Sequence, residues 1–178
     1  MTNNHSANIN NILRVCIMQV ECLQTKAFNR ELTKLGITKE KFGVLHQISL
    51  YEDNPTPFAL ARRMIYEPGT ISGILTRMEA DGLVIKHKDL KSKHMVRIEM
   101  TEKGRTIFEE AFKILKKLDD KLMASLNLEQ KEQLVASLLT LRDNSMHFVY
   151  GESKEFPSTS TFYRRAKKIV DYQKLREH

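Results

Sequence analysis

One stretch, EPGTISGILTRMEADGL at residues 67–83, limits what this chain can fold into more than any other part of it. Its apolar residues recur at the spacing of one helix face, and they are Ile71, Ile74, Leu75 and Met78. The opposite face carries small residues, which are Gly69, Thr70, Ser72, Gly73 and Thr76. Longer side chains usually make a more stable helix, so the small face needs a reason. Either it packs closely against another backbone, or it enters a narrow space.

The periodicity changes to that of strands directly after Asp81-Gly82. Val96, Ile98 and Met100 alternate with charged residues, and residues 83–88 supply the other half of a predicted two-stranded hairpin. Residues 84–100 carry five lysines and arginines against two acidic residues. A solvated charged surface would explain that balance. A basic hairpin directly after a small-faced helix is also the pattern of a DNA-binding wing.

Helices account for most of the remaining chain. The spacing of apolar residues predicts helices over residues 8–35, 38–51, 57–66, 68–80, 101–126 and 127–150, then a linker at 151–158 and a basic amphipathic helix at 159–176. The expected fold class is mainly α with a small β wing, in which a winged helix-turn-helix domain is inserted between long helices. In that arrangement the 68–80 helix lies in the DNA major groove, and its glycines let the backbone approach the DNA. Arg77 is then placed for a phosphate or a guanine.

The overall composition narrows the class of protein. The chain has 178 residues, a net charge of +7 and a pI of about 9.4, which suits binding to nucleic acid, an anionic membrane surface or an acidic protein. No apolar run is long enough to span a bilayer, and the N-terminus lacks the pattern of a secretion signal. Two cysteines on one predicted helix suit a reducing compartment. We therefore expect a cytoplasmic protein.

Residues 38–104 resemble the MarR family of winged helix-turn-helix transcriptional regulators. The segment GTISGILTRMEADGLV at residues 69–84 matches that family's recognition helix, and MTEKG at residues 100–104 matches the signature that follows its wing. Leu60-Ala61 and the spacing of Thr38, Phe42 and Leu45 also match, and the resemblance extends over about residues 8–149. The wing departs from the family's Asp-Pro-x-Asp-Arg-Arg, because residues 89–94 read DLKSKH. Since lysine is a point charge and not a planar fork, we expect a phosphate contact or a looser minor-groove contact from Lys93.

The resemblance implies a homodimer that binds double-stranded DNA at a pseudo-palindromic operator. It also implies release by a small aromatic or phenolic effector, and repression more often than activation. On this basis residues 1–36 form an N-terminal dimerisation helix, 37–100 the winged helix-turn-helix domain and 101–150 the C-terminal dimerisation helices. Residues 151–178 form a linker and an extra basic helix, which either packs on the dimer region or adds contacts to phosphates or another protein.

The candidate site residues follow from the pattern of the helix and hairpin and from the family resemblance. The residues expected to contact DNA are Thr56, Pro68, Gly69, Thr70, Ser72, Gly73, Thr76, Arg77, Lys91, Ser92, Lys93 and His94. The candidates for an effector pocket, chosen by their location, are Met18, Cys22, Phe42 and His46. We find no catalytic constellation, no metal-ligand spacing and no cofactor motif, so an enzyme is not expected.

Two other functions remain open on the sequence alone. The first is a thiol-based redox-sensing regulator that uses Cys16 or Cys22. These cysteines are six residues apart, so they do not share a helix face, and small core residues are the simpler interpretation. The second is a winged-helix module whose small-faced helix binds another protein.

Overall fold

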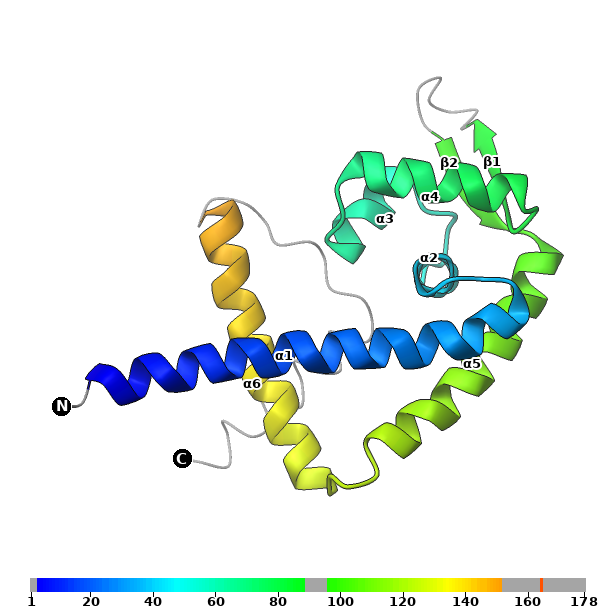
Figure 1. The fold of residues 1–178 in the computed structure, drawn as a ribbon. Coiled ribbons are helices and arrows are strands. Elements are labelled where there is room, and N and C mark those ends of the chain that lie inside the picture. The colour runs from blue at the N-terminus through cyan, green and yellow to red at the C-terminus, as the bar shows by residue number, and fades with distance from the viewer. Residues whose placement is uncertain (1–2, 89–95, 152–163, 165–178) are drawn as a thin grey trace.

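The computed structural model describes residues 3–88, 96–151 and 164, without the side chains of residues 3–7 (Figure 1). Over these residues the elements are α1 (Asn3–Leu32), the 3-10 helix η1 (Thr33–Leu35), α2 (Lys39–Ser49), α3 (Pro57–Met64), α4 (Pro68–Ala80), β1 (Val84–Lys88), β2 (Val96–Met100), α5 (Glu102–Leu122) and α6 (Leu128–Tyr150). The expected fold class, mainly α with a small β wing, is confirmed. None of the helices in the described part of the chain is both long enough and apolar enough to cross a membrane.

Some helix boundaries differ from the sequence prediction. The first helix begins at Asn3, earlier than expected, and the fifth ends at Leu122, four residues before the expected end. Residues 123–126 form a turn instead, because Asn127 is the N-cap of α6 and exchanges hydrogen bonds with Gln130 in a capping box. The predicted C-terminal helix at 159–176 lies outside the described residues except for Arg164.

Threonine side chains cap the N-termini of three helices, which are α2, α3 and α5. The hydroxyl oxygen of Thr38 accepts from the backbone N–H of Lys41, that of Thr56 from Ala59 and that of Thr101 from Gly104. Each bond satisfies an N–H that has no partner within its own helix, and losing such a cap typically costs about 1 kcal/mol. These caps explain why the helices begin where the sequence predicts.

The core of the winged domain lies where α2, α3, α4 and the strands meet. All four apolar residues of the α4 stripe are buried, as the sequence predicts. Leu45 of α2, Leu60 of α3 and Ile98 of β2 are completely inaccessible and belong to the same cluster. This cluster sets α4 on the outside of the domain, with its small face turned away from the core.

The wing is a two-stranded antiparallel sheet that is anchored at its base. Its register runs from Val84 opposite Met100 to Lys88 opposite Val96. The outer edge of β2 is hydrogen-bonded to the loop before α3, because the Ile98 N–H donates to the Pro55 carbonyl at 2.8 Å. Arg97 adds a bond from Nη1 to the Asn54 carbonyl at 3.0 Å. The loop between α2 and α3 therefore holds the wing beside the helix-turn-helix.

A second junction joins the wing to α5. The Thr101 hydroxyl donates to the Gly82 carbonyl at 2.7 Å, the Thr101 N–H donates to the Leu83 carbonyl at 3.1 Å, and Lys103 Nζ donates to the Asp81 carbonyl at 2.8 Å. Gly104 comes so close to Leu83 that a Cβ at this position would overlap the Leu83 carbonyl oxygen. The first turn of α5 is thus pressed against the backbone that leaves α4.

Stacked aromatic rings fill the contact between α2 and α5. The rings of Phe42 and Phe108 lie 5.8 Å apart, and His46 lies between them and Phe112 at centroid distances of 6.0–6.1 Å. Burial lowers the pKa of His46 below its usual value of 6.5, and the positive charge of Arg63 adds to that effect. Both effects favour the neutral form of the imidazole within the stack.

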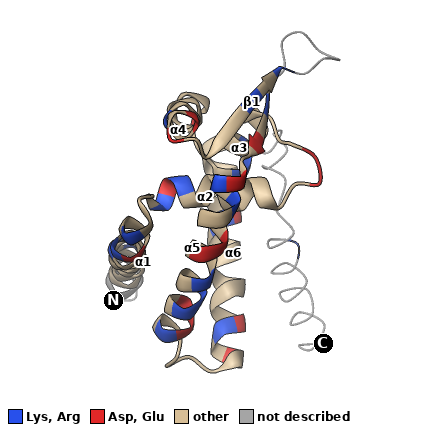
Figure 2. Ribbon diagram, turned by 90° about the vertical axis from the view of Figure 1, so that its right-hand side faces the viewer, with Lys and Arg blue, Asp and Glu red and all other residues tan. Residues whose placement is uncertain are grey.

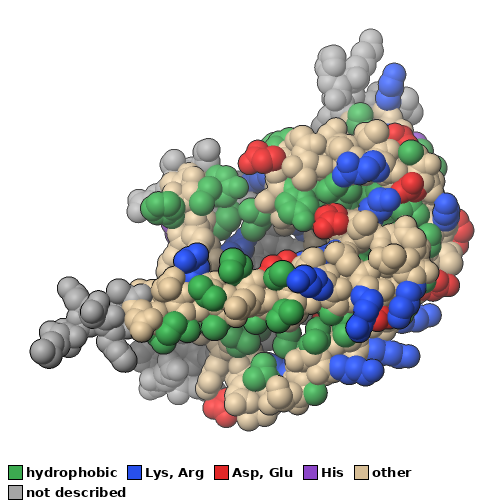
Figure 3. Space-filling model, in the orientation of Figure 1, with side chains coloured by type: hydrophobic (Ala, Val, Ile, Leu, Met, Phe, Trp, Pro, Cys, Tyr) green, Lys and Arg blue, Asp and Glu red, His purple; other side chains and the backbone are tan. Residues whose placement is uncertain are grey.

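Two helices extend away from this compact part. The first half of α1 and most of α6 project from the winged domain and cross each other in Figure 1. Hydrophobic side chains line the visible surface of α1 in Figure 3. On α6 Phe148 is 92% exposed and Val149 is 67% exposed, while Met146 is its single described buried residue. The apolar side chains on these two helices are therefore exposed among the residues that the structure describes.

We predict that Gly104→Ala destabilises the fold by about 2–3 kcal/mol, since the added methyl forces the α5 backbone away from Leu83. The measurement is the urea midpoint of unfolding, followed by circular dichroism. Gly69→Ala is the matched control, because a Cβ there has no described atom within 4 Å. In the control, the free energy of unfolding should rise by at most about 0.5–1 kcal/mol. Equal midpoints for the two variants would contradict the close approach.

We also predict a pH dependence of stability that His46 carries. Because the folded state lowers the pKa of His46, the unfolded state binds this proton more readily. Its contribution to stability is complete above pH 6.5 and declines as the pH falls below that value. His46→Phe keeps an aromatic ring in the stack and removes the titration. Melting temperatures between pH 7.5 and 5.5 should fall less steeply for this variant, and parallel curves would show that the histidine is not involved.

Candidate nucleic-acid interface

The small face of α4 is open. A Cβ added to Gly69 or to Gly73 would meet no described atom within 4 Å. Neither glycine has a positive φ, so neither is needed for its backbone conformation. Thr70, Ser72 and Thr76 are exposed on the same side of the buried stripe. Of the two reasons for a small face, close packing on another part of the described chain is therefore excluded.

The start of α4 is shaped by proline and by an unusual turn. Pro68 is the first residue of the helix, and the N-cap residue Glu67 makes no side-chain capping bond. The preceding helix, α3, ends at Met64, and its C-cap residue is Ile65, whose φ of 58° is in the left-handed region. A β-branched residue rarely adopts that conformation, and its backbone N–H closes the helix onto the Ala61 and Arg62 carbonyls. This turn sets the angle at which α4 leaves α3.

Hydrogen bonds limit what Thr76, one of the predicted DNA contacts, can do. The Thr76 hydroxyl donates to the Ser72 carbonyl at 3.0 Å, so its proton is already used within the helix. Lys86 Nζ of β1 donates to the same hydroxyl at 3.3 Å and forms an ion pair with Glu79 at 2.9 Å. Thr76 can therefore offer its methyl group to a base. Lys86, which the sequence analysis did not single out, fastens the wing to α4.

Arg77 is exposed on one flank of the small face. Its positive charge lies near α2, where the pKa of Glu40 is lowered, first by the hydrogen bond with Thr38 and to a smaller extent by Lys39 and Arg77. The neighbouring Asp81 forms an ion pair with Lys41. This side of α4 therefore carries alternating charges.

The other predicted DNA contacts fall into two groups. Thr56 is half-buried, and its hydroxyl caps α3, so its role in the described chain is structural. The predicted wing-tip contacts lie outside the described residues, and they are Lys91, Ser92, Lys93 and His94. Basic residues of β1 lead toward that tip (Figure 2), where His87 pairs with Glu99 of the opposite strand at 2.6 Å. Lys88 is exposed at the end of the strand.

The predicted effector residues separate into two places. Phe42 and His46 stack together and contact Phe108 and Phe112, which the sequence analysis did not name as site residues. The sequence signal for Phe108 and Phe112 is their four-residue spacing, which puts both rings on one face of α5. Met18 is 58% exposed on α1, and Cys22 is also exposed there. No cluster of three potential metal ligands occurs within the residues that the structure describes.

Comparison with known proteins identifies the family. No family model matches the chain. The solved structure of the organohalide-sensing transcriptional regulator RdhR, with 2,4-dichlorophenol bound, superposes with a TM-score of 0.78 at 38% identity, over 85% of this chain and 88% of that one. An HTH-type transcriptional regulator of Bacillus cereus is 29% identical over 72% of this chain and 82% of its own. A MarR transcriptional regulator from Methanosarcina mazei shares the fold, with a TM-score of 0.68 at 20% identity over 78% and 99% of the two chains.

The exposed small-faced helix, the anchored wing and the long flanking helices thus agree with the similarity to solved regulators, and the chain belongs to the MarR family of winged helix-turn-helix transcriptional regulators.

Proposed function

We propose that the protein is a homodimeric repressor that binds a pseudo-palindromic operator through α4 and the wing and leaves it when a small aromatic effector binds. The observation that carries the DNA contact is the open small face of α4. A helix-interior glycine costs about 0.5–1 kcal/mol relative to alanine. Gly73 lies in the interior of α4 and bears that cost without any packing or conformational need in the described chain, and Gly69 in the first turn is equally open. A DNA backbone or base edge approaching the helix closely supplies the reason.

The dimer is supported by the apolar surface of the projecting helices. A helix of 23 residues, such as α6, draws most of its stability from packing, yet among the described residues only its Met146 is buried. Its exposed apolar residues include Leu134, Leu138 and Phe148, and those of α1 include Leu13 and Ile17. Contiguous exposed apolar side chains of this kind are typical of surfaces where proteins associate. A second copy of the chain would cover it and set the two α4 helices about one DNA turn, ~34 Å, apart.

The aromatic stack supports the choice of effector. It lies where α5, which leads to the dimer helices, meets α2 of the winged domain, so a ligand there would contact both parts. Neutral His46 can exchange a hydrogen bond with a phenol hydroxyl, and the phenylalanine rings can stack on its ring. The related regulator RdhR was solved with 2,4-dichlorophenol. Met18 and Cys22 of α1 are further proposed contacts of this effector.

Gly73→Ala separates the cost to folding from the benefit to binding. We predict that it raises the free energy of unfolding by roughly 0.5–1 kcal/mol and weakens binding to the native upstream duplex by about tenfold, since a misfitted base or backbone contact costs about 1–3 kcal/mol. The two measurements are urea unfolding and fluorescence anisotropy with labelled DNA. Glu110→Ala, at an exposed position of α5, is the control and should leave specific binding unchanged.

The same titrations test the function itself. Wild-type protein should bind the native duplex more tightly than a scrambled one, with an affinity that falls as salt rises by a slope of about −0.9 per phosphate neutralised. Equal, weak binding to both duplexes would overturn sequence-specific recognition. In that case the alternative of a protein-binding winged-helix module would be favoured.

The dimer has its own test. Leu134 and Leu138 lie one turn apart and are both partly exposed on α6. Replacing both with lysine should convert a dimer into a folded monomer, because each buried leucine contributes about 1.5–3 kcal/mol to the interface. Sedimentation velocity gives the mass, and circular dichroism confirms the fold. Lys113→Glu on the exposed side of α5 is the control, and a monomeric wild-type protein would falsify the assignment.

A further inference from the structure

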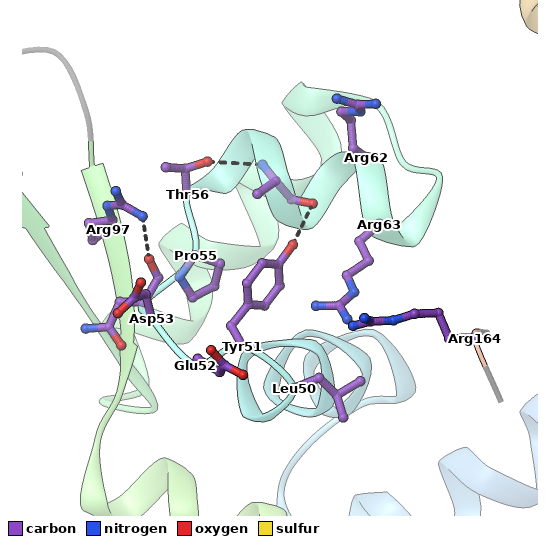
Figure 4. A pocket seen from close by; sticks show the side chains of 12 residues that line it. Leu50, Tyr51, Glu52, Asp53, Pro55, Thr56, Arg62, Arg63, Arg97 and Arg164 are labelled. Carbon is purple, nitrogen blue, oxygen red and sulfur yellow. Dashed lines mark hydrogen bonds between the residues drawn. The ribbon is translucent and has the colours of Figure 1, made fainter. Parts of the chain in front are cut away.

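The winged domain has a cavity of about 590 Å³ (Figure 4). No residue of α4 lines this cavity. Its walls come from the end of α2, the loop that leads to α3, the α3 helix and β2. The residues that matter for its chemistry are Tyr51, Arg62, Arg63, Arg97 and Arg164. None of the four rings in the aromatic stack lines it. The cavity is therefore separate from both the DNA-facing helix and the proposed effector site.

Arg63 is the central feature of this cavity. Its guanidinium lies over the ring of Tyr51, 4.4 Å from the centroid. Tyr51 is itself held by α3, because its hydroxyl donates to the Ala59 carbonyl at 3.4 Å. The Nε of Arg63 is buried and has no hydrogen-bond partner among the described residues. A buried donor without a partner is costly and is rarely left so, and this one belongs to a side chain that stacking already holds in place.

A second guanidinium, that of Arg164, also indicates that this cavity suits a negative group. Arg164 reaches in from the C-terminal segment, and its head group lies beside that of Arg63 in Figure 4. Two cations in this position repel each other unless a negative group lies between them. Arg62 and Arg97 also line the cavity, against the two carboxylates of Glu52 and Asp53. Its lining thus has a positive balance in a pocket that an apolar wall of Leu50, Pro55 and Ala59 completes.

We propose that this cavity binds a small organic anion, whose carboxylate or phosphate group sits between the Arg63 and Arg164 guanidiniums and whose body rests on the apolar wall. Guanidinium groups bind these anions through paired, charge-assisted hydrogen bonds, and the Nε–H of Arg63 would be one of the donors. The volume is that of a pocket for a small ligand. Because the walls join the end of α2 to α3 and to β2 of the wing, a ligand here would brace the helix-turn-helix against the wing.

The test follows the Arg63 Nε–H directly. The full-length protein is labelled with ¹⁵N-arginine, and the Arg63 side-chain resonance is assigned by its loss in Arg63→Gln. Sodium benzoate, inorganic phosphate and uncharged benzamide are titrated in turn at constant ionic strength. We expect a saturable shift with benzoate and with phosphate and none with benzamide. A shift that does not saturate, or that benzamide reproduces, would overturn the proposal.

Variants locate the binding. Arg164→Gln removes the second guanidinium without touching the winged-domain core, and it should weaken anion binding roughly tenfold, as expected for the loss of a charge-assisted hydrogen bond. Arg105→Gln, at an exposed position of α5, should leave the affinity unchanged. Equal loss in both variants would mean general charge screening and would contradict the site.

Duplex DNA provides the last arm of the experiment. If the Arg63 resonance shifts with DNA but with neither free anion, the cavity takes a DNA phosphate and the small-molecule proposal is wrong. The site does not depend on the proposed repressor function. If the protein binds the anions but no operator, the anion site stands and the repressor proposal fails. If it binds the operator but shows no anion-dependent shift, only the anion site is overturned.

Discussion

The structure depends most on the close contact between the first turn of α5 and the backbone that leaves α4. Gly104 lets α5 approach the Leu83 carbonyl, and the Thr101 hydroxyl bonds Gly82 while its backbone bonds Leu83. The strands pair between these two points, so the base of the wing is fixed where α5 begins. Any movement of α5 is therefore transmitted to the end of α4 and to the wing together. Through that connection the long helices outside the domain set the orientation of α4 and of the wing.

Helix α2 links the two candidate ligand sites. Its middle carries Phe42 and His46, which stack on α5, and its end carries Tyr51, which holds Arg63 of α3. The two sites also share an electrostatic effect, since the positive charge of Arg63 adds to burial in lowering the pKa of His46. An anion paired with Arg63 would weaken this effect. The neutral state of the histidine is thus connected with the charge in a cavity on the other side of the helix.

Burial is distributed very unevenly along the chain. The winged domain has a closed cluster that contains Leu45, Leu60 and Ile98, whereas α6 leaves Phe148 almost fully exposed. The hydrophobic effect scales with the area removed from water, so in the part of the chain that the structure describes, α6 gains less stabilisation from burial than the winged domain does. The polar and small surface lies on α4, and the apolar surface lies on α1 and α6. Under the proposed function, recognition of DNA and association between copies would therefore fall to different elements.

The sequence by itself determined the order of the helices, their threonine caps, the presence of a two-stranded hairpin and the buried stripe of α4, because these depend on short-range spacing and local hydrogen bonds. Only the tertiary structure decided that the small face of α4 is open, since the same glycines at the same spacing also suit a close helix contact. It also decided that Ile65 takes a left-handed turn, against the preference of a β-branched side chain. The aromatic stack and the arginine cavity could not be predicted either, because Phe42 meets Phe108 and Tyr51 meets Arg63 across helices whose relative positions no local pattern records.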